Sequence, residues 1–202
     1  MSWPTPVELQ GAHGALKPLA PKHHDGLVRA ANDGELSKLW YTSVPSAETM
    51  EREIARRLDL QSGGSMLPFT SFDAQGRIAG MTTYMNIDAT HRRVEIGSTW
   101  TAARLQRSAF NTECKLLLLD HAFEALDCIA VEFRTHFFNQ QSRRAIERLG
   151  ARLDGILRNH QRSGNGTLRD TCVYSITQAE WPTVEAHLRW QLHKPRDRPE
   201  GG

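Results

Sequence analysis

The spacing of apolar residues in the first third of the chain predicts a bent strand followed by two helices. A loose alternation over 7–19, broken by glycines, favours a strand or a bent hairpin. Helical spacing behind Pro21 predicts a helix over 21–32. A second amphipathic helix should begin near Ser46, whose neighbours suit an N-terminal cap, and end before the glycine-containing loop at 62–65.

The middle of the chain changes to a pattern typical of strands. Strands are predicted over 68–73, 77–87 and 93–101, and a short glycine-containing hairpin loop joins the first two. Dense apolar positions over 112–126 then predict a largely buried helix. A further strand is expected over 128–135.

Helices and strands alternate in the last third. We expect a helix over 139–149, strands over 152–160 and 170–177 on either side of a turn at 164–166, and a terminal helix over 180–192. Taken together, the elements predict a mixed α/β architecture with early helices, an antiparallel meander and a final β–α–β–α–β unit.

Composition favours one globular domain. The chain has 202 residues, of which 39% are hydrophobic and 24% are charged, and these fractions are ordinary for a soluble protein. We expect one domain over 1–193 and a disordered polar tail over 194–202. Cys114, Cys128 and Cys172 lie far apart in apolar surroundings and are predicted to be buried free thiols.

Several classes of protein are disfavoured. The formal net charge of +2 gives no basic excess of the kind that nucleic-acid binding needs. No basic and apolar leader is visible, and no run approaches the roughly 18 apolar residues of a membrane span, so we expect a cytoplasmic protein that binds no membrane. The histidines lack the spacing of metal ligands, so no metal is expected. No Ser-His-Asp order or GxSxG elbow indicates a covalent nucleophile.

One short loop before the buried helix has the character of an anion site. Its residues are Gln106, Arg107, Ser108, Ala109, Phe110 and Asn111. A loop that leads into a helix N-terminus presents backbone N–H groups and the positive end of the helix dipole, which suits a pyrophosphate. The same residues also suit a well-capped surface helix, and their spacing alone does not choose between the two.

Further motifs accompany the loop. The sequence Asn-Thr-Glu-Cys-Lys at 111–115 follows the loop. The motif Asn139-x-x-Ser142-x-x-Ala-Ile begins the next predicted helix, and Leu-Gly-Ala at 149–151 precedes an Asp-Gly pair. The chain therefore resembles the RimJ/RimL-type branch of the GNAT superfamily of N-acetyltransferases over most of its length, and most strongly from 93 to 177. In the family's loop fingerprint, Gln/Arg-x-x-Gly-x-Gly/Ala, only the glutamine is retained here.

The resemblance implies a fold and an activity. The fold would be a mixed, mostly antiparallel sheet of about six or seven strands flanked by helices, with the fourth and fifth strands, 93–101 and 128–135, splayed apart. The activity would be direct transfer of an acetyl group from acetyl-CoA, the co-substrate, to a primary amine in a ternary complex. The acceptor stays open among protein N-termini, amino acids, polyamines and drugs.

The resemblance also assigns residues to the coenzyme. A backbone N–H near Ser98, Thr99 and Trp100 would polarise the thioester carbonyl, and the loop at 106–111 would hold the pyrophosphate. Asn139 would bond the pantetheine arm, and Ser142 would protonate the departing thiolate as a general acid. Asn139 and Ser142 are also ordinary helix-capping residues, which is the simpler interpretation of that pair alone.

Candidates for the base and the acceptor pocket are less specific. Glu95 lies on the strand where the family often places a carboxylate, and it would serve as base and contact the acceptor; a structural, hydrogen-bonded role is the alternative. His160 titrates in the useful range, although a single histidine in a polar segment is often incidental. Trp40 and Tyr41 would line the pocket and bind a cationic amine, or would instead anchor their loop on the core.

Two other functions remain in competition with the enzyme. The first is a catalytically weak or inactive acyl-CoA-binding regulatory protein, which Ala109 favours because its methyl group reduces the clearance that glycine gives a phosphate. The second is a dimer-forming structural protein that uses the region of Trp181 and Trp190. A homodimer is also compatible with the enzyme.

Overall fold

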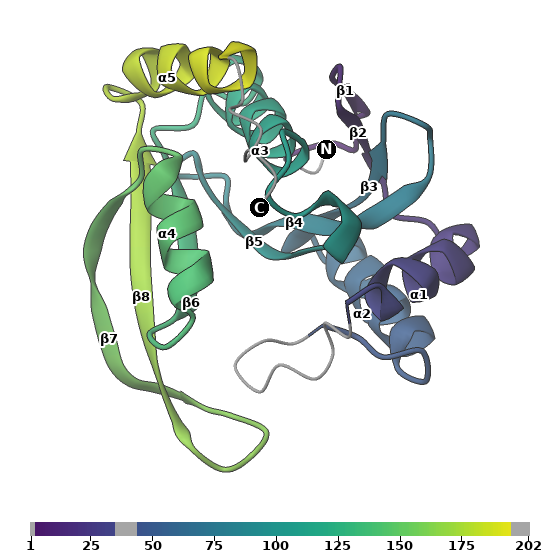
Figure 1. Cartoon of the computed structure of the whole chain (residues 1–202). Coiled ribbons are helices and arrows are strands. Elements are labelled where there is room, and N and C mark those ends of the chain that lie inside the picture. The colour runs from purple at the N-terminus through teal and green to yellow at the C-terminus, as the bar shows by residue number, and fades with distance from the viewer. Residues whose placement is uncertain (1–2, 35–43, 195–202) are drawn as a thin grey trace, which may run out of the picture.

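The computed structural model describes residues 3–34 and 44–194, and these contain eight strands in one sheet of order β1-β2-β3-β4-β5-β6-β8-β7 (Figure 1). The strands are β1 (Leu9–Gln10), β2 (Gly14–Pro18), β3 (Met66–Asp73), β4 (Ile78–Asp88), β5 (Arg93–Thr101), β6 (Ala130–His136), β7 (Arg152–Arg162) and β8 (Leu168–Thr177). The longer helices are α1 (His24–Asn32), α2 (Met50–Ser62), α3 (Phe110–Asp120), α4 (Gln140–Arg148) and α5 (Trp181–His193). The predicted single mixed sheet is confirmed.

The number of strands and two helix boundaries differ from the sequence-based expectation. The segment 7–19 forms a hairpin of two strands, which is one of the two forms predicted for it, and the sheet has eight strands where about six or seven were expected. The second helix begins at Met50 and not near Ser46, because Ser46 and Thr49 close a turn by mutual hydrogen bonds before the helix starts. The buried helix ends at Asp120 and is continued by a π-helical turn over His121–Ala125.

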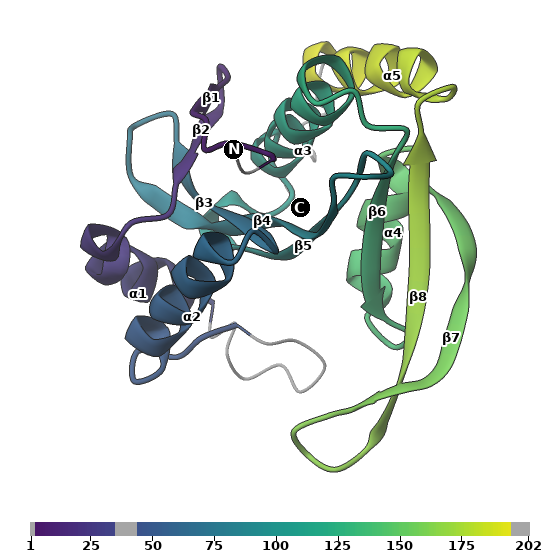
Figure 2. The same cartoon turned by 180° about the vertical axis from the view of Figure 1, so that it is seen from behind.

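Two apolar cores lie on opposite sides of the sheet. The smaller core packs α1 and α2 against β4 and β5 through residues such as Leu27, Ile54 and Met81. The larger core packs α3, α4 and α5 against the sheet and includes Tyr84 of β4 and Ile96 of β5. Figures 1 and 2 show α1 and α2 on the side of β3 and β4 that lies away from α3.

The central strands β5 and β6 are parallel and diverge after a short ladder. They pair at Arg93↔Ala130, Val94↔Val131 and Glu95↔Glu132. Beyond this point β5 continues beside β4 to Thr101, whereas β6 continues beside β8 to His136. The predicted splay between these two strands is therefore confirmed, and Figure 1 shows the two halves of the sheet turning away from each other.

A bulge interrupts β5 just after the divergence. Met81 pairs with Trp100 and Thr83 pairs with Gly97, so two residues, Ser98 and Thr99, stand opposite the single residue Thr82. An extra residue reverses the faces to which later side chains point. Ile96 accordingly belongs to the larger core, but Trp100, four residues later, belongs to the smaller one.

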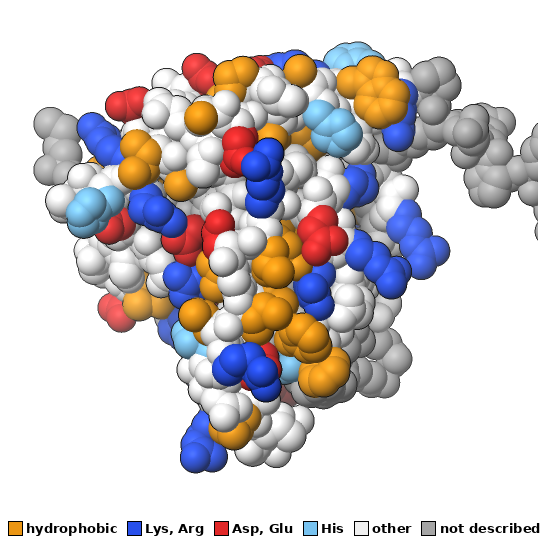
Figure 3. Space-filling model, turned by 90° about the vertical axis from the view of Figure 1, so that its left-hand side faces the viewer, with side chains coloured by type: hydrophobic (Ala, Val, Ile, Leu, Met, Phe, Trp, Pro, Cys, Tyr) orange, Lys and Arg blue, Asp and Glu red, His pale blue; other side chains and the backbone are white. Residues whose placement is uncertain are grey.

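The strand β7 is the exposed edge of the sheet. Leu153, Ile156 and Leu157 of β7 are large hydrophobic residues with exposed side chains, as is Leu168 of β8. Figure 3 faces this side of the molecule and shows a hydrophobic area with charged side chains around it. Within the described ranges, no helix is long and apolar enough to cross a membrane.

Candidate active site

Glu95 lies at the last ladder pair before β5 and β6 diverge. Its side chain is 5% exposed, accepts a hydrogen bond of 2.6 Å from Nδ2 of Asn86, and lies 3.5 Å from Nε of Arg134. Burial raises the pKa of the Glu95 carboxyl, and it outweighs the hydrogen bond from Asn86 and the charge of Arg134, which lower it. A carboxyl whose pKa is raised is a stronger base than an exposed carboxyl, which suits a general base.

A small cavity of about 110 Å³ opens beside Glu95. It is lined by Asn86, Asp88, Arg93, Val94, Glu95, Glu132 and Arg134. Glu132 forms ion pairs with Arg93 and Arg134. Burial raises the pKa of the Glu132 carboxyl, but the two arginines outweigh this effect, so the pKa is lowered. Two of the three carboxyls that line the cavity therefore differ: Glu132 holds its negative charge between two arginines, while Glu95 takes up a proton more readily.

The bulge presents backbone where the strands part. Ser98 has a φ of 48°, and its side chain and that of Thr99 are exposed. A bulge disrupts the ladder locally, which frees backbone groups to meet a ligand. The side chain of Trp100 packs in the smaller core, so any part that Trp100 plays at the site belongs to its backbone.

Arg57 of α2 supports this bulge and was missed by the sequence analysis. Its guanidinium donates to Oγ1 of Thr83 at 2.7 Å and to the carbonyl oxygen of Ser98 at 3.4 Å, while Glu53 accepts from its Nε at 2.7 Å. Burial lowers the pKa of Arg57, and the ion pair with Glu53 opposes that effect. In the sequence, Glu53 and Arg57 look like an ordinary solvated pair on one helix face.

The predicted phosphate loop connects β5 to α3. Gln106 donates from Nε2 to the carbonyl oxygen of Thr101 at 3.2 Å, which returns the loop to the end of β5. Ser108 donates to the carbonyl oxygen of Leu105 at 2.6 Å and accepts from the backbone N–H of Phe110 at 3.2 Å. Ser108 thus caps the start of α3.

Other loop residues divide between solvent and core. Arg107 is exposed with a φ of 58°, and Asn111 is half-buried in the first turn of α3. The ring of Phe110 lies in the larger core against Gly14, so only its backbone faces the loop. Ala109 has φ −67° and ψ −23°, an ordinary helical conformation that does not require glycine.

Asn139 and Ser142 form the cap of α4. The backbone N–H of Ser142 donates to Oδ1 of Asn139 at 3.0 Å, so the simpler, capping interpretation describes this bond. Neither the Asn139 amide nitrogen nor the Ser142 hydroxyl takes part in it, and both side chains are half-buried. At the other end of α4, Arg148 donates to Oγ1 of Thr112 at 3.2 Å, which ties α4 to the first turn of α3.

The remaining predicted residues are not brought to Glu95. His160 lies on β7, is exposed, and has its Nδ1 3.1 Å from Oγ1 of Thr171 on β8. Two strands, β6 and β8, separate β7 from β5 in the sheet. Trp40 and Tyr41 lie outside the described residues, as does the predicted tail beyond Lys194.

Trp181 and Trp190 divide between the core and the surface. Trp181 is buried, stacks on Phe123 and donates from Nε1 to Glu124 at 2.8 Å. Trp190 is 59% exposed, with Nζ of Lys194 lying 4.8 Å from its ring centroid. The three cysteines are buried and free, as predicted, and no cluster of metal-ligating side chains exists within 3–34 and 44–194.

Lys115 is a second residue that sequence analysis missed. It lies on α3 inside a run of apolar positions, is 7% exposed, and donates from Nζ to Oγ1 of Thr99 at 2.8 Å and of Thr82 at 3.3 Å. Burial lowers the pKa of Lys115 to about 7. The apolar neighbours of Lys115 in the sequence were the available signal, because a lysine within a buried helix needs a polar partner.

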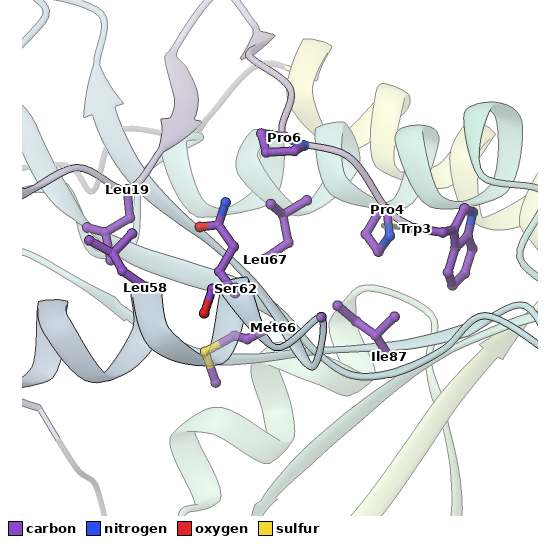
Figure 4. Close-up of a pocket in the computed structure, with 11 residues that line it drawn as sticks. Trp3, Pro4, Pro6, Leu19, Leu58, Ser62, Met66, Leu67 and Ile87 are labelled. Carbon is purple, nitrogen blue, oxygen red and sulfur yellow. The ribbon is translucent and has the colours of Figure 1, made fainter. Parts of the chain in front are cut away.

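A larger cavity of about 360 Å³ lies elsewhere. It is enclosed by the N-terminal segment, the end of α2 and strands β3 and β4, and Figure 4 shows Trp3, Pro4 and Pro6 above Leu58, Met66 and Ile87. None of the predicted site residues that the structure describes lines this cavity. Size alone therefore does not identify the reactive site, and the divergence of β5 and β6 is the better guide.

Comparison with known proteins agrees with this geometry. The model of the acetyltransferase (GNAT) domain matches residues 15–152. A curated Bacillus subtilis (strain 168) protein, provisionally named the ribosomal N-acetyltransferase YdaF, is 31% identical over 106 residues. That match covers 52% of this chain and 57% of the relative, so the chain spans little more than half of the curated relative it matches.

Solved structures match over nearly the full chain. A GCN5-related N-acetyltransferase from Brucella melitensis has a TM-score of 0.85 and 28% identity, covering 98% of this chain and 91% of its own. RimJ of Mycobacterium smegmatis, solved in complex with CoA-disulfide, has a TM-score of 0.76 and 22% identity, and the match covers 94% of this chain and 95% of its own. At that identity the second likeness concerns the fold alone.

Proposed function

Because the chain belongs to the acetyltransferase (GNAT) family, we propose that it transfers an acetyl group from acetyl-CoA directly to a primary amine. The observation that carries the proposal is the divergence of β5 and β6 at Glu95, immediately followed by the bulge at Ser98 and Thr99. A buried carboxyl and a bulge of two exposed residues thus lie close together on one strand. Direct attack by an amine needs a base and backbone donors for the thioester oxygen, which these two features would supply, and it needs no covalent nucleophile.

The loop and the cap of α4 fit the coenzyme. Backbone N–H groups at the start of α3, with exposed Arg107 beside them, suit a pyrophosphate. Ala109 has a helical φ, so its backbone conformation does not require glycine. The clearance that its methyl group takes from a phosphate, which favours the weak or regulatory coenzyme-binding protein, is a separate matter that Ala109→Gly tests. The amide nitrogen of Asn139 and the hydroxyl of Ser142 would face the pantetheine arm and the sulfur.

The bulge, Glu95 and Ser142 would each have a different role in the reaction. Backbone N–H groups of the bulge would hold the thioester oxygen as negative charge develops on it. Glu95 would take the proton from the attacking amine, directly or through water in the adjoining cavity, and Ser142 would protonate the departing thiolate. His160, two strands away, is a weaker candidate for the base. The acceptor would be a protein N-terminus or a small amine.

Acetyl-CoA binding and thiol release test the proposal together. Wild-type protein should be stabilised thermally by acetyl-CoA and should release free thiol with at least one member of a panel of peptide N-termini and small amines. Ser142→Ala should lower kcat by about tenfold or more while the KM for acetyl-CoA changes little, since a general acid acts only in the transition state. Ser62→Ala, at the exposed end of α2, is the matched control.

Each outcome separates the competing functions. No stabilisation by acetyl-CoA would contradict both the enzyme and the regulatory coenzyme-binding protein. Stabilisation without thiol release on any amine would favour the regulatory protein. An unchanged kcat in Ser142→Ala would remove Ser142 from the acid role. The cytoplasmic location and the homodimer stay predictions.

A further inference from the structure

Two buried cationic side chains reach the β5 bulge from opposite faces of the sheet. Arg57, from α2 in the smaller core, is 1% exposed and donates to the carbonyl oxygen of Ser98 and the hydroxyl of Thr83. Lys115, from α3 in the larger core, donates to the hydroxyl of Thr99 at 2.8 Å. The two bulge residues are therefore each held by a different helix, one from either side.

The conformation of the bulge explains why such support is needed. Ser98 has a φ of 48°, in the left-handed region that side-chain-bearing residues avoid. Strain of this kind costs about 1–3 kcal/mol, persists only where the surroundings fix it, and gathers at functional sites. Arg57 fixes the carbonyl group of Ser98, and Lys115 fixes the side chain of the next residue.

We propose that Lys115 is a positioning residue for acyl transfer, which together with Arg57 clamps the bulge so that its backbone N–H groups face the thioester carbonyl. This inference rests on the proposed function and deepens it. Lys115 acts through Thr99 and does not itself touch the coenzyme. Its own helix, α3, starts at the phosphate loop five residues earlier, so the clamp also links the pyrophosphate end of the site to the reacting end.

Stability alone does not account for a lysine at this place. Burial lowers the pKa of Lys115 to about 7, and no carboxylate in the described part of the chain contributes to raising it. A methionine of similar length fills the same space without the desolvation of an amine. Residues that break the rules of core composition in this way are concentrated at functional sites.

The clamp also has an electrostatic consequence. Where Lys115 is protonated, it and Arg57, which is paired with Glu53, place positive charge on both sides of the strand that would hold the oxyanion. Fixed charges of this kind act strongly where water is excluded, and they need no rearrangement when the charge develops. They would favour the transition state over the bound thioester, whose oxygen is neutral, so their loss should appear in kcat.

Steady-state kinetics of Lys115→Met separate this role from a structural one. We expect kcat to fall by about tenfold or more, while the KM for acetyl-CoA changes by less than about twofold and the protein unfolds at no lower urea concentration than wild type. Lys22→Met, at an exposed lysine, is the matched control. Thr99→Val tests the same contact from the other partner.

Coupling between the two residues gives a second readout. Because Lys115 acts through Thr99, the double variant Lys115→Met/Thr99→Val should be about as slow as the slower single variant, and the two effects should not multiply. Three results would each overturn the inference. The first is a wild-type kcat in Lys115→Met, and the second is a double variant whose effects multiply. The third is a fall in kcat that is accompanied by a weaker KM and a lower stability of similar size. Failure of wild type to release thiol with any amine would instead refute the proposed function, and this inference with it.

Discussion

Replacing Lys115 by methionine should change how the stability of the protein depends on pH. The pKa of Lys115 falls from 10.5 in the unfolded chain to about 7 in the folded protein, because burial disfavours the charged amine. Between these two values the unfolded state holds more protons than the folded state. Stability therefore rises with pH through this window, by up to about 1.4 kcal/mol per pH unit.

The expected magnitude follows from the occupancy of the two states. At pH 7 the folded amine is half protonated while the unfolded amine is almost fully protonated; at pH 9 the difference between the states approaches one proton. Over these two pH units, Lys115 should add about 2 kcal/mol to the free energy of unfolding. Below pH 7 both states hold the proton and the cost of burying the charge is constant.

Urea unfolding at pH 7 and pH 9, followed by tryptophan fluorescence, measures the effect. Lys115→Met lacks the titrating group, so the wild type should gain about 2 kcal/mol more than the variant on going from pH 7 to pH 9. The variant should be at least as stable as wild type at pH 7. Lys22→Met should follow the wild-type curve. Parallel curves for wild type and Lys115→Met would refute the reasoning, since they would mean that the amine is not desolvated.

Two further substitutions test the frame of the coenzyme site. Glu113→Gln should lower the free energy of unfolding, measured in urea, by about 2–3 kcal/mol. The reason is that the Glu113 carboxylate accepts hydrogen bonds from the backbone N–H groups of Ala12, His13 and Gly14 at 2.6–2.9 Å. A loss no larger than that of the exposed control Glu51→Gln would contradict this prediction. Ala109→Gly should leave the Kd for coenzyme A, measured by calorimetry, within about twofold of wild type, because the φ of −67° needs no glycine. The same substitution should lower the free energy of unfolding by about 0.5–1 kcal/mol. Binding that is tighter by about tenfold would show that the methyl group obstructs the phosphates.

The period of apolar residues was enough to predict most of the sheet and the helices. The strands at 68–73, 77–87, 93–101 and 128–135 alternate or run apolar because one or both faces are buried, and each has its counterpart in the structure. The boundary at Ser46 was wrong because a capping sequence also suits a turn, and only the mutual bonds of Ser46 and Thr49 distinguish the two.

The contacts of Arg57 and Lys115 with the bulge could not be predicted from the sequence, and the reason is physical. Glu53 and Arg57 are four residues apart, a spacing that usually marks a solvated pair, and Lys115 interrupts an apolar helix without a nearby partner in the chain. Their common target appears only when the sheet folds. The register slip that puts Ser98 and Thr99 opposite Thr82 depends on how β4 and β5 pair, and no local pattern specifies it.

The parallel ladder between β5 and β6 is three pairs long, and this has a mechanical consequence. A short ladder resists bending much less than the long ladders on either side, so the sheet is stiff within each half and compliant at their junction. The contacts of Arg134 with Glu95 and of Arg148 with Thr112 cross that junction on side chains alone. The larger core also spans the junction through α3 and α5. Substitutions at Arg134 or Arg148 should therefore change the opening between the halves before they disturb the strand pairing within either half.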